Sequence, residues 1–158
     1  MTERESKLRV ESAAFSQGKP FPAKHTADGR DVSPALSWSG SPPGARSLAL
    51  VCEDPDAPRG TWIHWVLYDI PPSVTSLPEA VPSRETVPGL GTHGKNDFGS
   101  LGYGGPAPPS GTHRYFFRLY ALDRSLSLAA GATARELRRA MEGHVLAQGE
   151  LMGTYSRR

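Results

Sequence analysis

Polar side chains that could carry chemistry gather in three short segments of this sequence. The first, Asp54-Pro55-Asp56-Ala57-Pro58, follows an apolar run and holds two carboxylates between prolines. Because a proline fixes its own φ at about −65° and restricts the residue before it, the segment is expected to be stiff. It predicts either a rigid carboxylate pair at the mouth of a pocket or an ordinary turn, in which Asp and Pro are favoured for local reasons.

The second segment, Trp62–Tyr68, reads WIHWVLY and is rich in the aromatic and β-branched residues typical of a strand. The period of two of a strand puts His64 on the same face as Val66. A histidine on such a face is more often a half-buried structural residue than a ligand of a bound molecule, so both interpretations stay open.

The third segment, His113–Tyr120, reads HRYFFRLY and follows a glycine-rich loop at Gly102–Pro106. Its alternation puts His113 and Tyr115 on one face of a strand. Glycines let the backbone approach a ligand closely and expose successive N–H groups to an anion. The three segments together are typical of a small anion pocket, although their order along the chain does not show that they converge.

Composition places the chain among globular, β-rich proteins. Its 158 residues are 37% hydrophobic and 22% charged, and 17 glycines and 15 prolines break it too often for a helical bundle. A net charge of +2 is too weak to favour nucleic-acid binding. No apolar run approaches the roughly 18 residues of a membrane span, and the N-terminus lacks the apolar region of a signal peptide. The single cysteine, Cys52, allows no internal disulfide and fits a reducing cytoplasm.

The apolar segments that must position these groups are short and bounded by Gly and Pro, as in an all-β core. We expect strands at Leu8–Val10, Leu36–Trp38, Ser47–Val51, Trp62–Ile70 and Arg114–Leu122. Thr133 and Glu136 form a capping box, which predicts one interrupted helix or two short ones between Ala134 and Met152. The irregular stretch Pro88–Gly111 is expected to be a long functional loop.

Four motifs stand in a recognisable order: DPDAP at 54–58, HW at 64–65, GYGGP at 102–106 and HRY at 113–115. Together they resemble the phosphatidylethanolamine-binding protein family, in its bacterial Raf-kinase-inhibitor-like branch, and the resemblance covers nearly all of residues 8–155. It implies one domain over residues 1–158. That domain would be mainly β, with a large central antiparallel sheet, a second smaller sheet and one or two short C-terminal helices.

The resemblance also implies a small pocket for phosphate, acetate or the phosphoryl head of phosphatidylethanolamine. Carried over onto this sequence, the pocket residues are Asp54, Asp56, His64, Gly105, His113 and Tyr115. The histidines, the tyrosine hydroxyl and the glycine N–H would donate to the anion. The carboxylates would hold a histidine in its donor tautomer or face an ammonium group. A cis peptide bond at Pro55 or Pro58 and a homodimer are further expectations, whereas kinase inhibition belongs to the eukaryotic branch and is not carried over.

We therefore expect a cytoplasmic, non-catalytic protein with a regulatory role that binds a small anion or a phospho-head-group. No metal, cofactor, nucleic acid or integral membrane association is expected, and the sequence does not indicate a protein partner. Three alternatives remain. The polar groups could form a buried network that only stabilises loops. The two histidines and a carboxylate could be the ligands of a metal-assisted hydrolase, although no closely spaced histidine pair is present. The protein could also be an interaction scaffold.

Overall fold

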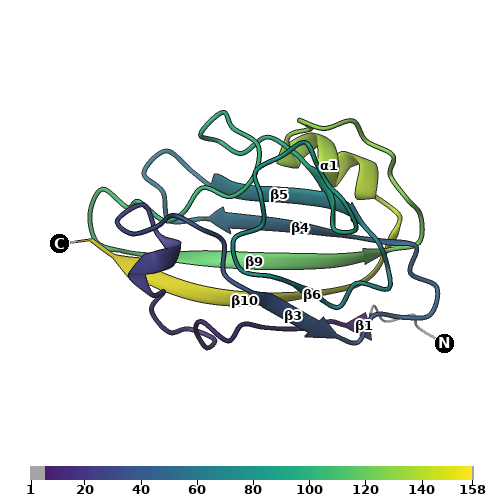
Figure 1. The fold of residues 1–158 in the computed structure, drawn as a ribbon, viewed down its shortest axis with the longest axis horizontal. Coiled ribbons are helices and arrows are strands. Elements are labelled where there is room, and N and C mark those ends of the chain that lie inside the picture. Colours follow the sequence, from purple (N-terminus) through teal and green to yellow (C-terminus); the bar gives the residue numbers. More distant parts are fainter. Residues whose placement is uncertain (1–5, 158) are drawn as a thin grey trace.

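The computed structural model describes residues 6–157, which form two β-sheets, one α-helix and a short 3-10 helix (Figure 1). Across the large sheet the strands follow the order β1 (Ser6–Lys7), β10 (Val145–Ser156), β9 (Thr112–Leu122), β4 (Ser47–Asp54), β5 (Trp62–Ile70), β8 (Gly91–His93) and β7 (Thr86–Val87). The small sheet consists of β2 (Arg9–Glu11), β3 (Leu36–Ser39) and β6 (Ser76–Leu77). All neighbouring strands are antiparallel except β1 and β10, which run parallel. The predicted mainly β fold, with a large central sheet and a smaller second one, is confirmed.

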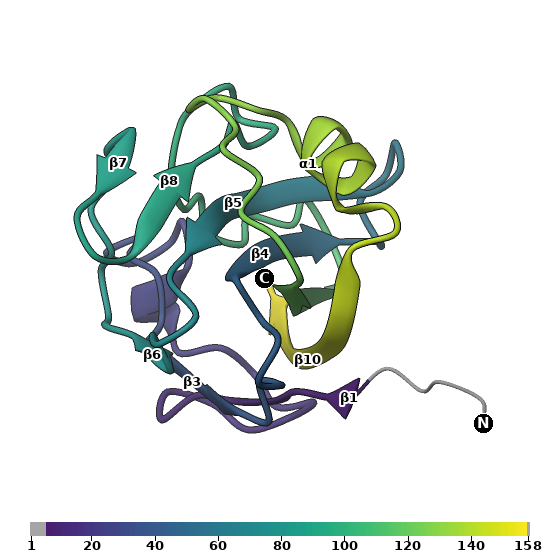
Figure 2. The same ribbon diagram turned by 90° about the vertical axis from the view of Figure 1, so that its right-hand side faces the viewer.

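The central strands of the large sheet are covered on both faces. Every residue of β4 is buried, which explains why its sequence, SLALVCED, is a nearly continuous apolar run without alternation. On one face, Trp65 and Phe117 pack with residues of the small sheet; on the other, Val66 packs with Leu137 of helix α1 (Ala134–Met141). Seen along the strands, α1 and the small sheet accordingly lie on opposite sides of the large sheet (Figure 2).

Helix α1 begins with the capping box that the sequence predicts. The Thr133 hydroxyl accepts from the Glu136 N–H at 3.1 Å, and the Glu136 carboxylate accepts from the Thr133 N–H at 2.9 Å. Leu137 and Met141 are buried against the sheet. No helix within residues 6–157 is long and apolar enough to cross a membrane.

The prediction that helix continues to Met152 is wrong. The helix ends at Met141, Gly143 takes the left-handed φ of +79°, and the chain then forms β10, which pairs with β9 along its length. The apolar residue at every fourth position indicated a helix, but backbone pairing with the eleven-residue strand β9 outweighs that local pattern. The other helical segment, the 3-10 turn η1 (Ala23–His25), lies near the N-terminus.

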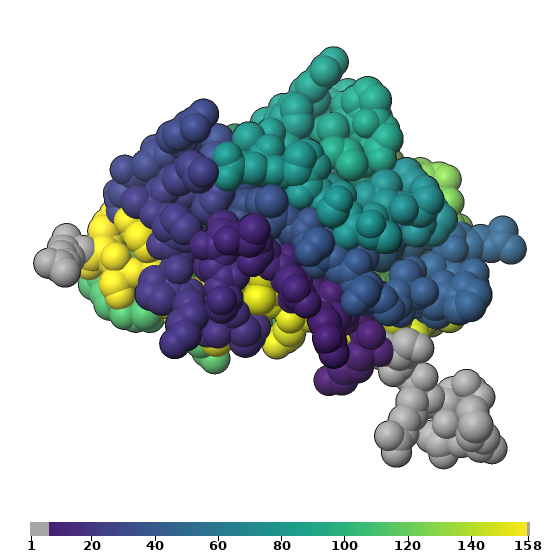
Figure 3. All heavy atoms as spheres, turned by 60° about the horizontal axis from the view of Figure 1, so that its bottom comes forward, coloured from purple at the N-terminus to yellow at the C-terminus, as the bar shows by residue number. Residues whose placement is uncertain are grey.

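The segment that follows β2 runs along the outer edge of β10, as Figure 3 shows for the N-terminal part of the chain. The N–H groups of Gly18 and Phe21 donate to the carbonyls of Met152 and Thr154, each at 2.7 Å. The side chain of Gln17 accepts from the Met152 N–H at 3.0 Å. These bonds satisfy backbone groups that an exposed edge strand would leave unpaired.

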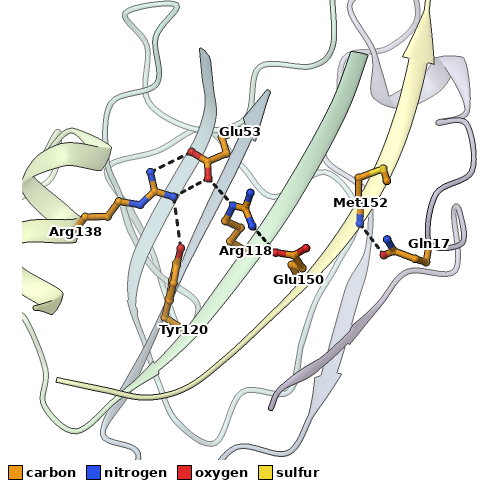
Figure 4. A network of polar contacts seen from close by, with 7 residues as sticks. All are labelled: Gln17, Glu53, Arg118, Tyr120, Arg138, Glu150 and Met152. Atoms are coloured by element: carbon orange, nitrogen blue, oxygen red, sulfur yellow. Dashed lines mark hydrogen bonds and ion pairs between the residues drawn. The ribbon is translucent and has the colours of Figure 1, made fainter. Parts of the chain in front are cut away.

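An ion-pair network fixes the end of β4 to its neighbours (Figure 4). The buried Glu53 carboxylate accepts from Arg138 of α1 at 2.8 and 3.1 Å and from Arg118 of β9 at 2.6 Å. Arg118 also pairs with Glu150 of β10. Burial alone would raise the pKa of Glu53, but the hydrogen bonds from Arg138 and Arg118 outweigh it and hold that pKa below its ordinary value. The network therefore ties the helix and three strands together around a charged carboxylate.

Strand β5 contains a bulge at His64. Cys52 of β4 lies opposite Trp65, but the next residue, Glu53, lies opposite Ile63, so that His64 has no partner of its own. An extra residue in one strand reverses the alternation of side chains beyond it. The sequence gives no signal for this bulge, because no glycine or proline marks it.

The bulge moves the His64 side chain to the other face of the sheet. Val66 packs in the cluster under α1, whereas the His64 ring lies 5.2 Å from the ring of Tyr115, which belongs to the opposite core. The prediction that His64 and Val66 share a face is therefore wrong. The strand period alone would have turned this histidine towards the helix.

The prediction of a cis proline bond is also wrong, since residues 6–157 contain no cis peptide bond. The chain reverses after β4 by other means. The Asp54 carboxylate accepts from the Asp56 N–H at 2.7 Å, and the Gly60 N–H donates to the Ala57 carbonyl at 3.1 Å. An Asp side chain that bonds the backbone two residues on forms such a turn with trans bonds.

Candidate functional site

A cavity of about 220 Å³ opens where β4 ends and β5 and β9 begin. These strand ends lie on the left in Figure 1. Four of the six predicted site residues line it: Asp54 from β4, His64 from β5, and His113 and Tyr115 from β9. Apolar residues complete the wall: Ala57, Pro58, Trp62, Phe98, Ala107, Pro108 and Pro109. Strands far apart in sequence thus bring most of the predicted polar groups into one space.

Asp54 and His113 form a buried pair in this wall. The carboxylate lies 2.7 Å from Nδ1 of the ring, and both side chains are less than a tenth exposed. Because a carboxylate can only accept, Nδ1 carries the hydrogen. The pair therefore fixes the orientation of His113 and leaves Nε2 as the ring atom available to a ligand.

His64 is held by the glycine-rich loop. Its Nδ1 donates to the Gly104 carbonyl at 2.6 Å, and the Gly104 N–H donates back to the His64 carbonyl at 2.9 Å. A Cβ on Gly104 would lie 2.5 Å from the ring of Phe98, so a larger residue here would displace that ring. Burial lowers the pKa of His64 even though Gly104 and Asp54 favour the charged ring. The ring is thus neutral at pH 7, and its Nε2 is buried without a hydrogen-bond partner.

Tyr115 places a free hydroxyl in the same wall. Its oxygen is buried and has no partner within residues 6–157. Its ring lies 5.2 Å from that of His64 and 6.4 Å from that of His113. Burial, followed by the negative charge of Asp54, raises the pKa of Tyr115 well above its ordinary value, so the hydroxyl keeps its proton and can donate it to a ligand.

The rim of the cavity is aromatic. Trp62 and Phe98 are the large hydrophobic residues that stay exposed in the described chain, at 38% and 47%, and their rings meet edge to face at 5.5 Å. Phe98 comes from the predicted functional loop Pro88–Gly111, which also supplies Ala107 and the prolines beside it. The loop is less irregular than expected, since it contains strand β8. The sequence interpretation missed this rim, although an aromatic residue in a glycine-rich loop was a visible signal.

Comparisons with known proteins identify the family of the chain. The family model described as phosphatidylethanolamine-binding protein matches residues 11–156. The chain belongs to the phosphatidylethanolamine-binding protein family. The resemblance seen in the four motifs is therefore confirmed over almost the whole sequence.

Relatives occur in archaea and bacteria. A UPF0098 protein of Methanothermobacter thermautotrophicus is 51% identical over 150 residues, covering 95% of this chain and 99% of that protein. A crystal structure described as a phosphatidylethanolamine-binding protein homologue from Chlamydia trachomatis has a TM-score of 0.88 at 42% identity. The E. coli protein YbcL, described as a member of the mammalian family, also has a TM-score of 0.88, at 30% identity. Each structure covers 96% of this chain, and this chain covers 99% of each.

Asp56, although predicted for the pocket, lies outside the cavity of this family member. Its carboxylate is bound at 2.9 Å by Nε and Nη2 of Arg114 and by the Arg114 backbone N–H. The hydrogen bonds from Arg114 lower the pKa of Asp56. Arg114 lies between His113 and Tyr115 on β9, so alternation turns it to the opposite face and takes Asp56 with it.

Gly105 does not line the cavity either. Its N–H donates to the Asp31 carboxylate at 2.7 Å, so it is already satisfied within the protein. A Cβ at this position would lie 2.6 Å from both Asp31 and the His25 carbonyl. The glycine is needed because the loop packs closely against the segment around η1, and Tyr103 adds a bond to the His25 carbonyl at 2.6 Å.

The ligand set of a metal-assisted hydrolase is not assembled in the described chain. Within residues 6–157, no three His, Cys, Asp or Glu side chains gather closely enough to hold one metal ion. In the cavity, Asp54 is bonded to His113, and His64 turns one ring nitrogen to a backbone carbonyl. Cys52 is buried within β4.

Proposed function

We propose that the protein binds a small organic anion in this cavity, through a phosphoryl or carboxyl group, and does not transform it. The observation that carries the proposal is the pair of buried, unpartnered polar atoms in the cavity wall, Nε2 of His64 and the hydroxyl of Tyr115. Buried polar atoms in proteins nearly always have a hydrogen-bond partner. A ligand that accepts from the Tyr115 hydroxyl and donates an O–H group to Nε2 of His64 would satisfy both.

The size and rim of the cavity favour an organic anion over a bare ion. Its volume of about 220 Å³ is several times the roughly 30 Å³ that a water molecule occupies. The exposed rings of Trp62 and Phe98 stand at its edge, and most of its lining is apolar. Ligand pockets commonly combine an apolar wall with a few placed polar groups. A phospho-head-group or a phosphorylated aromatic compound would offer an anionic group to the polar side chains and an organic part to the apolar wall.

A binding role without catalysis fits the chemistry of the wall. Asp54 orients His113 as a carboxylate orients a catalytic base, but the described lining contains no serine, threonine, cysteine or lysine that such a base could activate. We accordingly assign the Asp54–His113 pair to ligand recognition. The regulatory role expected for the family would follow if a partner distinguishes the filled cavity from the empty one.

Calorimetric titration with phenyl phosphate tests the proposal. We expect saturable binding to the unmodified protein and none to Ala107→Phe, because the larger side chain fills the cavity from its half-buried position. Ser110→Phe is the matched control, since Ser110 is exposed in the same loop and does not line the cavity. Absence of binding to the unmodified protein, or equal binding to both variants, would contradict the proposal.

A cytoplasmic location and a homodimer remain proposals from the sequence. The chain mass is 17.0 kDa. Light scattering at micromolar concentration should give twice this mass, and a value equal to the chain mass would overturn the homodimer.

A further inference from the structure

We infer that the cavity selects anionic groups that carry their own hydrogen-bond donor, such as the protonated monoanion of a phosphomonoester, and rejects oxyanions without a proton, such as a sulfate ester. The inference rests on the proposed function and narrows it to a ligand class. Its basis is the direction in which each polar group of the wall can form a hydrogen bond.

His64 offers an acceptor to the cavity. Its one ring hydrogen is committed to the Gly104 carbonyl, since a carbonyl cannot donate. Nε2 of the neutral ring therefore presents a lone pair. The charged groups that act on this ring, besides Asp54, are the carboxylates of Asp97 and Asp31; they favour the charged ring, but burial opposes them and prevails. Asp97 and Asp31 are themselves bonded to the N–H groups of Ile63 and Gly105.

His113 repeats the same arrangement. Its Nδ1 hydrogen is committed to Asp54 at 2.7 Å, so Nε2 is the one ring nitrogen that can contact a ligand. The Asp54 carboxylate can only accept. Of the two buried polar atoms in the wall that have no partner, the Tyr115 hydroxyl can donate a hydrogen, whereas Nε2 of the neutral His64 ring can only accept one. At the exposed rim, the indole N–H of Trp62 adds one more donor.

The lining also lacks the groups that usually bind a fully ionised oxyanion. Among the described residues around the cavity there is no lysine and no arginine. Arg114, which lies between His113 and Tyr115 in sequence, is committed to Asp56 on the other face of the sheet. Arg59, which follows Pro58, is exposed and does not line the cavity. The arginine whose charge acts on Tyr115, Arg157, is itself paired with Asp28. A proton-free oxyanion would therefore place its oxygens against lone pairs without an unpaired cation in the lining to compensate.

A ligand that brings a proton removes this conflict. The P–O–H group of a phosphomonoester monoanion can donate to Nε2 of His64 or His113 while its other oxygens accept from Tyr115. Because leaving a buried acceptor unpaired is unfavourable, a proton-free analogue should bind about 10-fold more weakly or worse. Sites built around a hydrogen bond generally reject the analogue that lacks it.

Three ligands of similar shape and equal charge test the inference by calorimetry at about pH 5.5. Phenyl phosphate is then mostly a monoanion with one P–O–H group, because the second pKa of such esters is about 6. Phenyl sulfate and methyl phenyl phosphate are monoanions without a proton. Methyl phenyl phosphate also represents the phosphodiester linkage of a glycerophospholipid, so it separates a monoester ligand from a lipid phosphate.

We expect phenyl phosphate to bind at least about 10-fold more tightly than either proton-free ligand. Its affinity should fall as the pH rises to about 8, where it loses its proton, while phenyl sulfate stays weak throughout. Comparable affinities for phenyl phosphate and phenyl sulfate at about pH 5.5 would overturn the inference and leave the proposed function standing. No binding of any of the three would overturn the proposed function itself.

A variant of His64 provides an independent readout. His64→Phe keeps an aromatic ring against Tyr115 and Phe98 but removes the acceptor. The ratio of phenyl phosphate to phenyl sulfate affinity should then shrink towards one, whatever the change in absolute affinity. An unchanged ratio would contradict the role of Nε2. If the variant does not fold, the comparison of the three ligands on the unmodified protein decides the inference.

Discussion

Nδ1 of His113 donates to the Asp54 carboxylate at 2.7 Å, while the neighbouring carboxylate of the same turn, Asp56, is bound by Arg114 on the other face of the sheet. Two aspartates only two positions apart therefore have different roles. One orients a histidine in a buried cavity, and the other fixes the outer surface of the loop. This separation provides matched variants for the binding site.

Asp54→Asn should lower the affinity for phenyl phosphate about 10-fold. The carboxylate makes Nε2 of His113 a stronger acceptor. A neutral amide weakens that effect if its oxygen accepts from Nδ1, and it reverses the tautomer of His113 if its N–H donates to Nδ1. Asp56→Asn is the control and should change the affinity less than about twofold, because Asp56 does not line the cavity. Equal losses in calorimetric titrations of the two variants would contradict the assignment.

Tyr115→Phe should separate binding from stability. Its hydroxyl is buried without a partner, so its removal should leave the free energy of unfolding unchanged or slightly higher, while phenyl phosphate affinity falls about 10-fold. Tyr68→Phe should do the reverse, because the Tyr68 hydroxyl donates to the Ala129 carbonyl at 2.5 Å and accepts from the Ala132 N–H at 3.2 Å. We expect a stability loss of about 1 kcal/mol without a change in binding. Urea denaturation and calorimetry on both variants measure the two quantities, and a destabilised Tyr115→Phe that binds normally would refute the prediction.

Glu53→Ala should destabilise the fold by about 2 kcal/mol. The variant removes the carboxylate that Arg118 and Arg138 share and leaves two partly buried guanidinium groups without it. We expect a smaller loss of stability than for a fully buried ion pair because both arginines are about a third exposed. Glu150→Ala removes an exposed carboxylate from the same network and should cost less than about 1 kcal/mol. Equal denaturation midpoints for the two variants would show that the network does not depend on Glu53.

Stability should fall as the pH drops below about 6.5. Burial lowers the pKa of both His93 and His64, so the unfolded chain takes up protons at a higher pH than the folded one. The contribution of the neutral rings is therefore complete above about pH 6.5 and is lost as the pH falls through the lower folded pKa values. His93 also needs the neutral form, because Nδ1 donates to the Arg84 carbonyl and Nε2 accepts from the indole of Trp65.

Urea denaturation between about pH 7.5 and 5.5 measures this dependence. His93→Gln should reduce the slope of unfolding free energy against pH. His144→Gln is the matched variant and should reduce the slope less than His93→Gln does, because the His144 side chain is about a third exposed and pairs with Asp123 at the surface. A flat profile of the unmodified protein over this range would contradict the prediction.

Much of the fold could be predicted from local patterns. The strands at Leu36–Trp38, Trp62–Ile70 and Arg114–Leu122 appear as β3, β5 and β9, and the capping box at Thr133 starts a helix as expected. These features depend on nearby residues, which the sequence displays directly. The strand β10 did not follow from its own pattern, because pairing with β9 determines it.

The site could be predicted only in part, for the same reason. Asp54, His113 and Tyr115 reach the cavity by simple alternation and by the turn after β4. His64 reaches it through a bulge that depends on pairing with β4 and has no mark in the sequence. Gly105 was expected to face the anion, but Asp31, far away in sequence, occupies its N–H. Contacts of this kind become visible only once the chain is folded.

The most direct measurement is a crystal structure of the protein grown with saturating phenyl phosphate. We predict the phosphoryl group inside the cavity, within hydrogen-bond distance of the Tyr115 hydroxyl and of Nε2 of His64, with the phenyl ring against Trp62 or Phe98. An empty cavity under these conditions, or a ligand bound only on the outer face beside Arg114, would contradict the account.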